Sequence, residues 1–170
     1  MRQLKIQRQV RDDRFFVRLL RLFFGGKMAF IKEGKFLVRS FIEDLDESGL
    51  ATDSEELKSE SEGFLRAAED EMLLTYTEGE GESKVFSQVL IRGESVVVNR
   101  RGASESSMIL KVGEKHTSVY KVPPYSFDME VEAKRIRNTM SLKGGRLDLF
   151  YLMTIGGQAR KVRLTIDFAV

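Results

Sequence analysis

Short apolar runs separated by tight polar turns fill residues 84–127. Four runs alternate with turns at 92–94, 101–106 and 113–115. Strands of this length joined by such short turns are typical of neighbouring antiparallel hairpins. The pattern therefore predicts antiparallel β-structure in the middle of the chain, around which the other segments are arranged.

The residues before this stretch alternate in the same way. From residue 35 onward Phe36, Val38 and Ile42 share one side of a first expected strand. Residues 55–66 contain many glutamates but still alternate, so they are interpreted as a strand and not a helix. Residues 72–78 form a third expected strand, rich in Thr and Tyr. The acidic residues 44–56 are expected to form the only long loop of the body.

The residues after the central stretch predict a bulge. Phe127, Met129 and Val131 occupy odd positions, whereas Ile136 and Met140 occupy even ones. A period of two changes phase only where an extra residue is inserted, which predicts a β-bulge near residues 134–135. Glycine pairs at 144–145 and 156–157 are then expected to turn the chain into two final strands.

About ten strands in meander order, with no long helix in the body, predict an all-β fold. We expect a single antiparallel up-and-down barrel of about eight to ten strands, because closure removes the exposed edges of so large a sheet. A sandwich would need several long connections between its sheets, and only 44–56 is long enough to supply one.

Composition places limits on the chemistry. The chain has 170 residues with 42% hydrophobic content, which fits one domain, expected at 35–170. It has no cysteine and a single histidine, His116, so thiolate chemistry and multi-histidine metal sites within the chain are excluded. No apolar run approaches the about 20 residues that a spanning helix needs. We expect a soluble, cytoplasmic protein with no cofactor or metal.

Residues 1–34 form a basic N-terminal extension. Within residues 1–27 eight cationic side chains face only Asp12 and Asp13, whereas the whole chain has a net charge of +2, so the body is acidic. The extension is expected to be helical or disordered, and a surface-binding amphipathic helix stays open. Alternatively, Met28 is the true start, because residues 25–28 can be encoded by GGA GGA AAA ATG, which looks like a ribosome-binding site followed by a start codon.

Three motifs in the second half carry a resemblance, and they are Asn99-Arg100-Arg101-Gly102, Ser107-Met108-Ile109-Leu110, and Tyr120-Lys121-Val122-Pro123 followed by Phe127. Their order and spacing resemble the YwiB-like family of bacterial domains of unknown function over about 35–170. The resemblance implies a calycin-like β-barrel, similar in architecture to lipocalins. It implies no activity and no catalytic residues.

The inward positions suggest a site inside the barrel. A barrel of this size is either filled by side chains or holds one small ligand. Tyr76, Tyr120 and Tyr151 would be polar groups in an otherwise apolar interior. Arg100 and Arg101, beside Gly102, form either an anion site at the barrel mouth or a solvated turn. The acidic run Glu78, Glu80 and Glu82 is interpreted as a solubilising turn, and His116 as exposed.

Three classes of function remain open. The first is a non-catalytic barrel that binds a small apolar or amphipathic molecule. The second is a protein-interaction module or homodimer, because Phe150 and Leu152 are apolar on the face opposite Leu149 and Tyr151. The third and least favoured is an enzyme, since no phosphate loop, nucleophile elbow or metal spacing is present. The acidic body disfavours nucleic acid as a partner.

Overall fold

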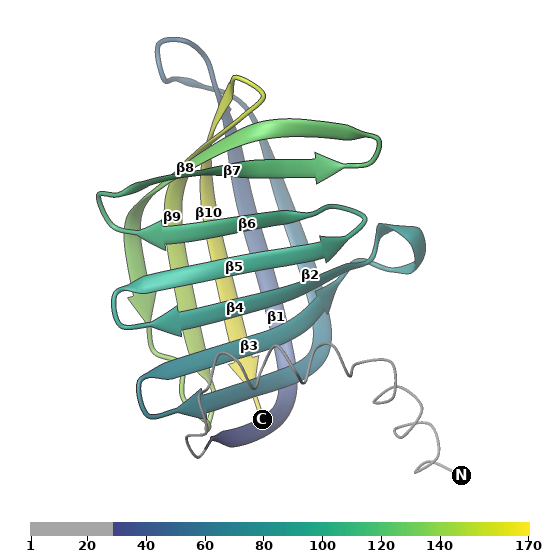
Figure 1. Cartoon of the computed structure of the whole chain (residues 1–170), viewed down its shortest axis with the longest axis vertical. Coiled ribbons are helices and arrows are strands. Elements are labelled where there is room, and N and C mark those ends of the chain that lie inside the picture. Colours follow the sequence, from purple (N-terminus) through teal and green to yellow (C-terminus); the bar gives the residue numbers. More distant parts are fainter. Residues whose placement is uncertain (1–28) are drawn as a thin grey trace.

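Alternation of inward apolar and outward polar side chains organises the chain into antiparallel strands (Figure 1). The structure, a computed structural model, describes residues 29–170. The strands are β1 Phe30–Leu45, β2 Ala51–Ala68, β3 Glu71–Glu78, β4 Val85–Arg92, β5 Ser95–Gly102, β6 Ser106–Lys111, β7 Lys115–Val122, β8 Tyr125–Asn138, β9 Gly145–Ile155 and β10 Gln158–Ala169. Residues 30–34 of the expected helical or disordered extension belong to β1 instead, whereas residues 1–28, with the alternative start at Met28, lie outside the described residues.

The strands form one sheet in the order β6-β5-β4-β3-β2-β1-β10-β9-β8-β7. The first and last strands join it into a barrel, because β1 pairs with β10 from Lys35↔Ala169 to Asp44↔Arg160. Figure 1 shows β3–β6 crossing in front of β1, β9 and β10 at a steep angle. The expected all-β, up-and-down antiparallel barrel is confirmed.

Closure is incomplete between β6 and β7, the two ends of the sheet. These strands are joined by an isolated antiparallel bridge between Glu105 and Lys121, with two N–H···O bonds of 2.9 Å. Near the other end of β6, Val112 forms a parallel bridge with Ala133 of β8. Between these points the Ile109 N–H donates to Nδ1 of His116 at 3.4 Å. The barrel is therefore nearly closed.

The predicted bulge in β8 is present. The pairing of β8 with β9 shifts register between Ala133 and Arg135, so Lys134 is the extra residue. Met129, Val131 and Ala133 are buried before the bulge. The extra residue bends the strand where the sheet curls.

The expected long loop at 44–56 is wrong. β1 and β2 continue as a protruding hairpin, and only residues 46–50 form the turn between them. The Asp46 carboxylate holds this turn by accepting hydrogen bonds from the Ser48 and Leu50 N–H groups, each 2.9 Å long. Both faces of this hairpin end are largely exposed, so its strands lack the apolar alternation that identifies a strand in a sequence.

The packed core fills one half of the barrel. Phe36 is its centre, with ring centroids 5.2 Å from Tyr76 and 4.9 Å from Phe168. Gly34 and Gly63 face one another across β1 and β2 beside these rings. A Cβ on Gly34 would lie 2.5 Å from the Phe168 ring, and one on Gly63 would lie 2.9 Å from the Phe36 ring. The two glycines therefore leave the space that the aromatic rings occupy.

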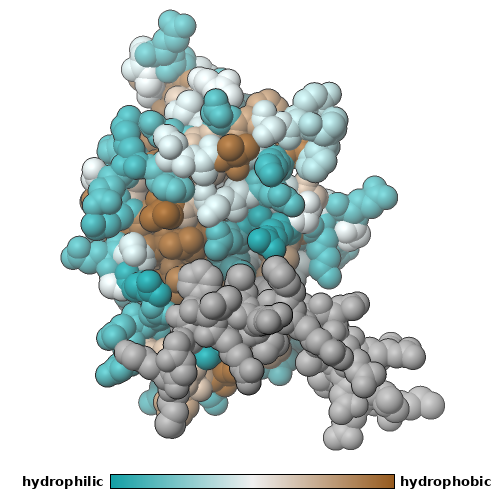
Figure 2. Space-filling model, in the orientation of Figure 1, coloured by the Kyte–Doolittle hydropathy of each residue, from teal (hydrophilic) through white to brown (hydrophobic). Residues whose placement is uncertain are grey.

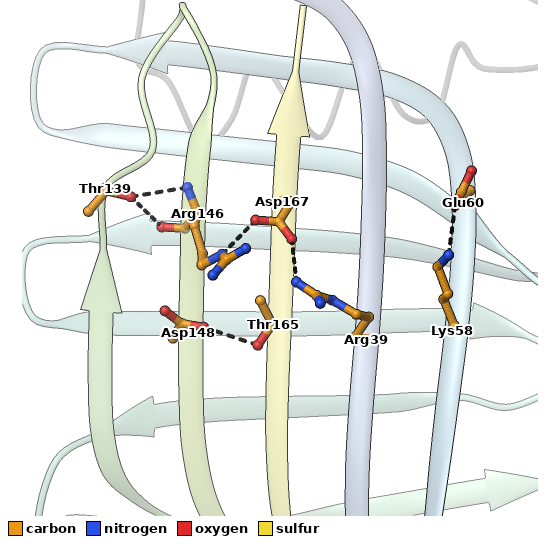
Figure 3. Close-up of polar contacts among 8 residues, drawn as sticks. All are labelled: Arg39, Lys58, Glu60, Thr139, Arg146, Asp148, Thr165 and Asp167. Carbon is orange, nitrogen blue, oxygen red and sulfur yellow. Dashed lines mark hydrogen bonds and ion pairs between the residues drawn. The ribbon is translucent and has the colours of Figure 1, made fainter.

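Charged side chains on the outer face link β1, β9 and β10 (Figure 3). Asp167 accepts hydrogen bonds from Arg39 Nη2 at 2.9 Å and from Arg146 Nε at 2.6 Å. Next to it, the Thr165 hydroxyl donates to Asp148 at 3.0 Å. Burial acts to raise the pKa of Asp167, but the hydrogen bonds and positive charges of Arg146 and Arg39 outweigh it, and the net pKa is lowered.

This network predicts a pH-dependent stability. Because the folded-state pKa of Asp167 is depressed, its contribution is complete above the unfolded pKa of about 4 and is lost as the pH falls through the folded value. We expect Asp167→Asn to lower the free energy of unfolding by about 1 kcal/mol at neutral pH, since the arginines are partly exposed. Urea denaturation should show this difference shrinking towards pH 2. The exposed Glu47→Gln serves as the control, and a pH-independent difference would contradict the assignment.

Candidate functional site

A cavity of about 570 Å³ occupies the other half of the barrel. It forms where the sheet divides, because β2 pairs with β3 only through Phe64–Ala68 while residues 51–63 pair with β1 alone. The free part of β2 and the ends of β3, β5 and β7 surround it. Its apolar lining comes from all sides of the barrel and consists of Val38, Ile42, Leu57, Val85, Val98, Met108, Met129, Met153, Ile155, Val162 and Leu164.

The structure brings four of the five sequence-predicted site residues to this cavity. Tyr76, Tyr120, Tyr151 and Arg100 line it, on β3, β7, β9 and β5 respectively. Arg101 does not, and it is exposed on the barrel's outer side. Successive residues of a strand point to opposite faces, so two adjacent arginines within β5 cannot act as one pair. The alternative that both belong to a solvated turn is also wrong, since Arg100 and Arg101 both lie in β5.

Five polar side chains lie inside the barrel. We call them the interior polar cluster, which consists of Tyr76, Glu78, Ser87, Arg100 and Tyr151. The Glu78 Oε2 atom accepts a hydrogen bond of 2.6 Å from the buried Ser87 hydroxyl and one of 3.1 Å from Arg100 Nη2. Within the described residues the buried Nε of Arg100 has no hydrogen-bond partner. One carboxylate oxygen therefore accepts two hydrogen bonds, whereas the Nε of the guanidinium makes none.

The two tyrosines of the interior polar cluster stay protonated. Burial and the negative charge of Glu78 raise the pKa of Tyr76 well above its ordinary value, against an opposing effect of Arg100. Burial also raises the pKa of Tyr151 to about 12, with the positive charge of Arg100 acting in the opposite direction. Near neutral pH both phenols are uncharged and offer O–H donors to the interior.

The sequence analysis did not identify Glu78 and Ser87 as site residues. Glu78 had been grouped with Glu80 and Glu82 as a solubilising turn, but its side chain is only 20% exposed and pairs with Arg100. The strand phase could have shown this, because Glu78 lies two residues after the inward Tyr76. Ser87 likewise lies between the buried Val85 and Val89. The long-range pairing with Arg100, by contrast, depends on which strands become neighbours.

Side chains near the cavity tie the protruding hairpin to β10. Arg160, which lines the cavity, donates from Nε to Asp44 Oδ1 at 2.7 Å. Gln158 Nε2 donates to the Leu45 carbonyl at 3.0 Å. These contacts hold the turn end of the β1–β2 hairpin against β10, and Glu55 and Leu57 of the same hairpin line the cavity.

Among residues 29–170 no group of three or more His, Asp or Glu side chains is placed to hold a metal ion. His116 does not line the cavity, and its Nδ1 accepts from the β6 backbone. No helix in this part of the chain is long and apolar enough to cross a membrane.

The outer patch at Phe150 and Leu152 is partly buried and interrupted by charge. Arg163 packs over the Phe150 ring at 5.6 Å from its centroid, which is a cation–π distance. Leu152 pairs in register with Lys161 on one side and Glu132 on the other. On the opposite side of the barrel, the coloured surface in Figure 2 is largely hydrophilic, with small separated hydrophobic areas.

Comparisons with known proteins agree with this architecture. A family model described as a domain of unknown function, DUF1934, matches residues 44–166. The crystal structure of the ywiB protein from Bacillus subtilis is similar with a TM-score of 0.65 at 20% sequence identity, covering 82% of this chain and 96% of that chain. A search of curated proteins found no match. The resemblance indicated by the motifs of β5–β8 is confirmed, and the chain belongs to the DUF1934 family of domains of unknown function.

Proposed function

We propose that this protein is a non-catalytic barrel that binds one small amphipathic molecule in its interior cavity. The observation that carries the proposal is the cavity of about 570 Å³, whose lining combines apolar side chains with Tyr76, Glu78, Arg100 and Tyr151 of the interior polar cluster and with further polar residues such as Lys58 and Arg160. Ligand sites in proteins have volumes of about 300–1,000 Å³ and combine apolar walls with a few placed polar groups. A cytoplasmic carrier or sensor would use such a site.

The chemistry of the lining supports binding over catalysis. Glu78 is held by Ser87 and Arg100, and the two buried tyrosines are neutral at neutral pH. An acid–base mechanism needs groups whose pKa values lie near the working pH and which reach the substrate. The raised pKa values of Tyr76 and Tyr151 move these groups away from that range.

Native mass spectrometry of the protein purified gently from a bacterial cytosol tests the proposal. We expect an additional mass that remains in the native spectrum and disappears on denaturation. A bare polypeptide that also fails to take up added amphipathic molecules would contradict it.

Filling the cavity should abolish binding without unfolding the barrel. Met153 lines the cavity, and its neighbour Leu152 points outward. We expect Met153→Trp to weaken binding of the dye 8-anilinonaphthalene-1-sulfonate by about tenfold or more, equivalent to about 1.4 kcal/mol. Leu152→Trp, the matched control, should bind the dye as the wild type does. Equal dye binding by both variants would place the dye site outside the cavity.

A second candidate function is a homodimer or partner-binding module that uses the outer face around Phe150 and Leu152. The observation in its favour is Phe41, which is 37% exposed and lies across β10 from Phe150, both being paired with Arg163. The same native spectrum tests this alternative, since a dimer peak would support it. The charged neighbours of the patch make it the weaker candidate.

A further inference from the structure

We infer that the molecule bound in the cavity carries an anionic head group, of which a carboxylate is the simplest case, and that Arg100 recognises it. This inference rests on the proposed function and adds the chemical class and the orientation of the ligand. Its basis is the incomplete pairing of the Arg100 guanidinium in the interior polar cluster.

One acceptor atom in the cluster is already used. Glu78 Oε2 receives both Ser87 Oγ and Arg100 Nη2. Ser87 is fully buried, and its hydroxyl proton is donated to Glu78. Two hydrogen-bond donors therefore already converge on this one carboxylate oxygen.

Donors in the cluster are in excess. A guanidinium has five N–H donors, and Glu78 takes one of those of Arg100 in a contact that is not bidentate. The Arg100 side chain remains 35% exposed and lines the cavity. Its buried Nε lacks a partner within the described residues, which is uncommon for a folded protein. Tyr151, which also lines the cavity, carries a further O–H donor.

The remaining walls indicate how the rest of the ligand lies. Met108, Met129 and Met153 line the cavity together with Ile155 and Leu164. Methionine side chains are flexible and polarisable, and they adapt to apolar groups of different shapes. The head group is therefore expected to determine specificity, whereas the apolar tail is recognised only by size and hydrophobicity.

Isothermal titration calorimetry of the full chain with sodium decanoate, 1-decanol and decylammonium tests the inference. All three probes share one tail, and each is used below the concentration at which it aggregates. We expect decanoate to bind at least about tenfold more tightly than decanol, because a charge-assisted hydrogen bond is gained, and decylammonium to bind most weakly. If decanol binds as tightly as decanoate, or decylammonium binds most tightly, the head-group assignment is overturned while the proposed function survives. If none of the three binds, both fail.

Neighbouring arginines provide the matched variants. Arg100→Met should reduce decanoate affinity by about tenfold or more and leave decanol affinity nearly unchanged, whereas the outward Arg101→Met should alter neither. Because Arg100→Met leaves the Glu78 carboxylate without its cation, the Glu78→Gln/Arg100→Met double variant is measured as well. Retention of the preference for decanoate in a folded variant lacking Arg100 would remove this residue from head-group recognition.

Discussion

Phe36→Ala is expected to lower the free energy of unfolding by about 3–5 kcal/mol. The Phe36 ring is 1% exposed and stacks between Tyr76 and Phe168, so its removal deletes apolar contacts and leaves a cavity that the surrounding rings cannot fill. Urea denaturation followed by tyrosine fluorescence measures the change.

Phe41→Ala is the control for this substitution, because it lies on the same strand but faces outward. Phe41 is 37% exposed and pairs in register with Arg163 and Glu56. We expect a loss of no more than about 1 kcal/mol, since little of its contact surface is core. Equal losses for the two variants would show that the packing around Phe36 does not dominate barrel stability.

Gly63→Ala is expected to cost about 3 kcal/mol, at or above the upper end of ordinary overpacking. The added Cβ would collide with the Thr75 carbonyl oxygen and would lie 2.9 Å from the Phe36 ring. The oxygen belongs to the backbone of β3, at the last pair that joins β2 to β3. The Thr75 oxygen can move away from the added Cβ only if β2 and β3 separate, and that separation would open the packed half of the barrel.

Gly49→Ala distinguishes a clash from the loss of backbone freedom. Gly49 has a φ of 82° in the β1–β2 turn, with no atom within 4 Å of an added Cβ. The left-handed conformation alone is expected to cost about 1 kcal/mol. Thermal unfolding of the two variants should therefore differ clearly, and a Gly63→Ala protein as stable as Gly49→Ala would argue against the close approach at Thr75.

Much of the fold could be predicted from the sequence, since alternation is a local property. Alternation placed Phe36, Val38 and Ile42 of β1 on one side, and the phase change between Val131 and Ile136 located the bulge of β8. The 44–56 hairpin escaped prediction because it protrudes from the barrel. Its strands bury little on either face, and they carry no period of two for a reader of the sequence to find.

The candidate site was only partly predictable. Tyr76, Tyr120 and Tyr151 were selected because strand phase places them inward, and Arg101 was included through its neighbour Arg100. Successive residues of a strand point to opposite faces, so the two arginines are placed on opposite faces once β5 is known to extend to Gly102. The sequence instead suggested a turn at 101–106. The contact of Glu78 with Arg100 joins residues on strands that are not sequential neighbours.

The sequence by itself determined the meander order of the strands, the inward side of those that alternate and the bulge of β8, because these follow from period-two alternation and short turns. Only the tertiary structure decided where the interior is packed and where it is hollow. That choice depends on β2 being separate from β3 before Phe64 and on the glycines beside Phe36, which leave space for the aromatic rings in one half of the barrel. Packing of this kind depends on contacts between segments that are distant in the sequence, and a local sequence pattern does not contain that information.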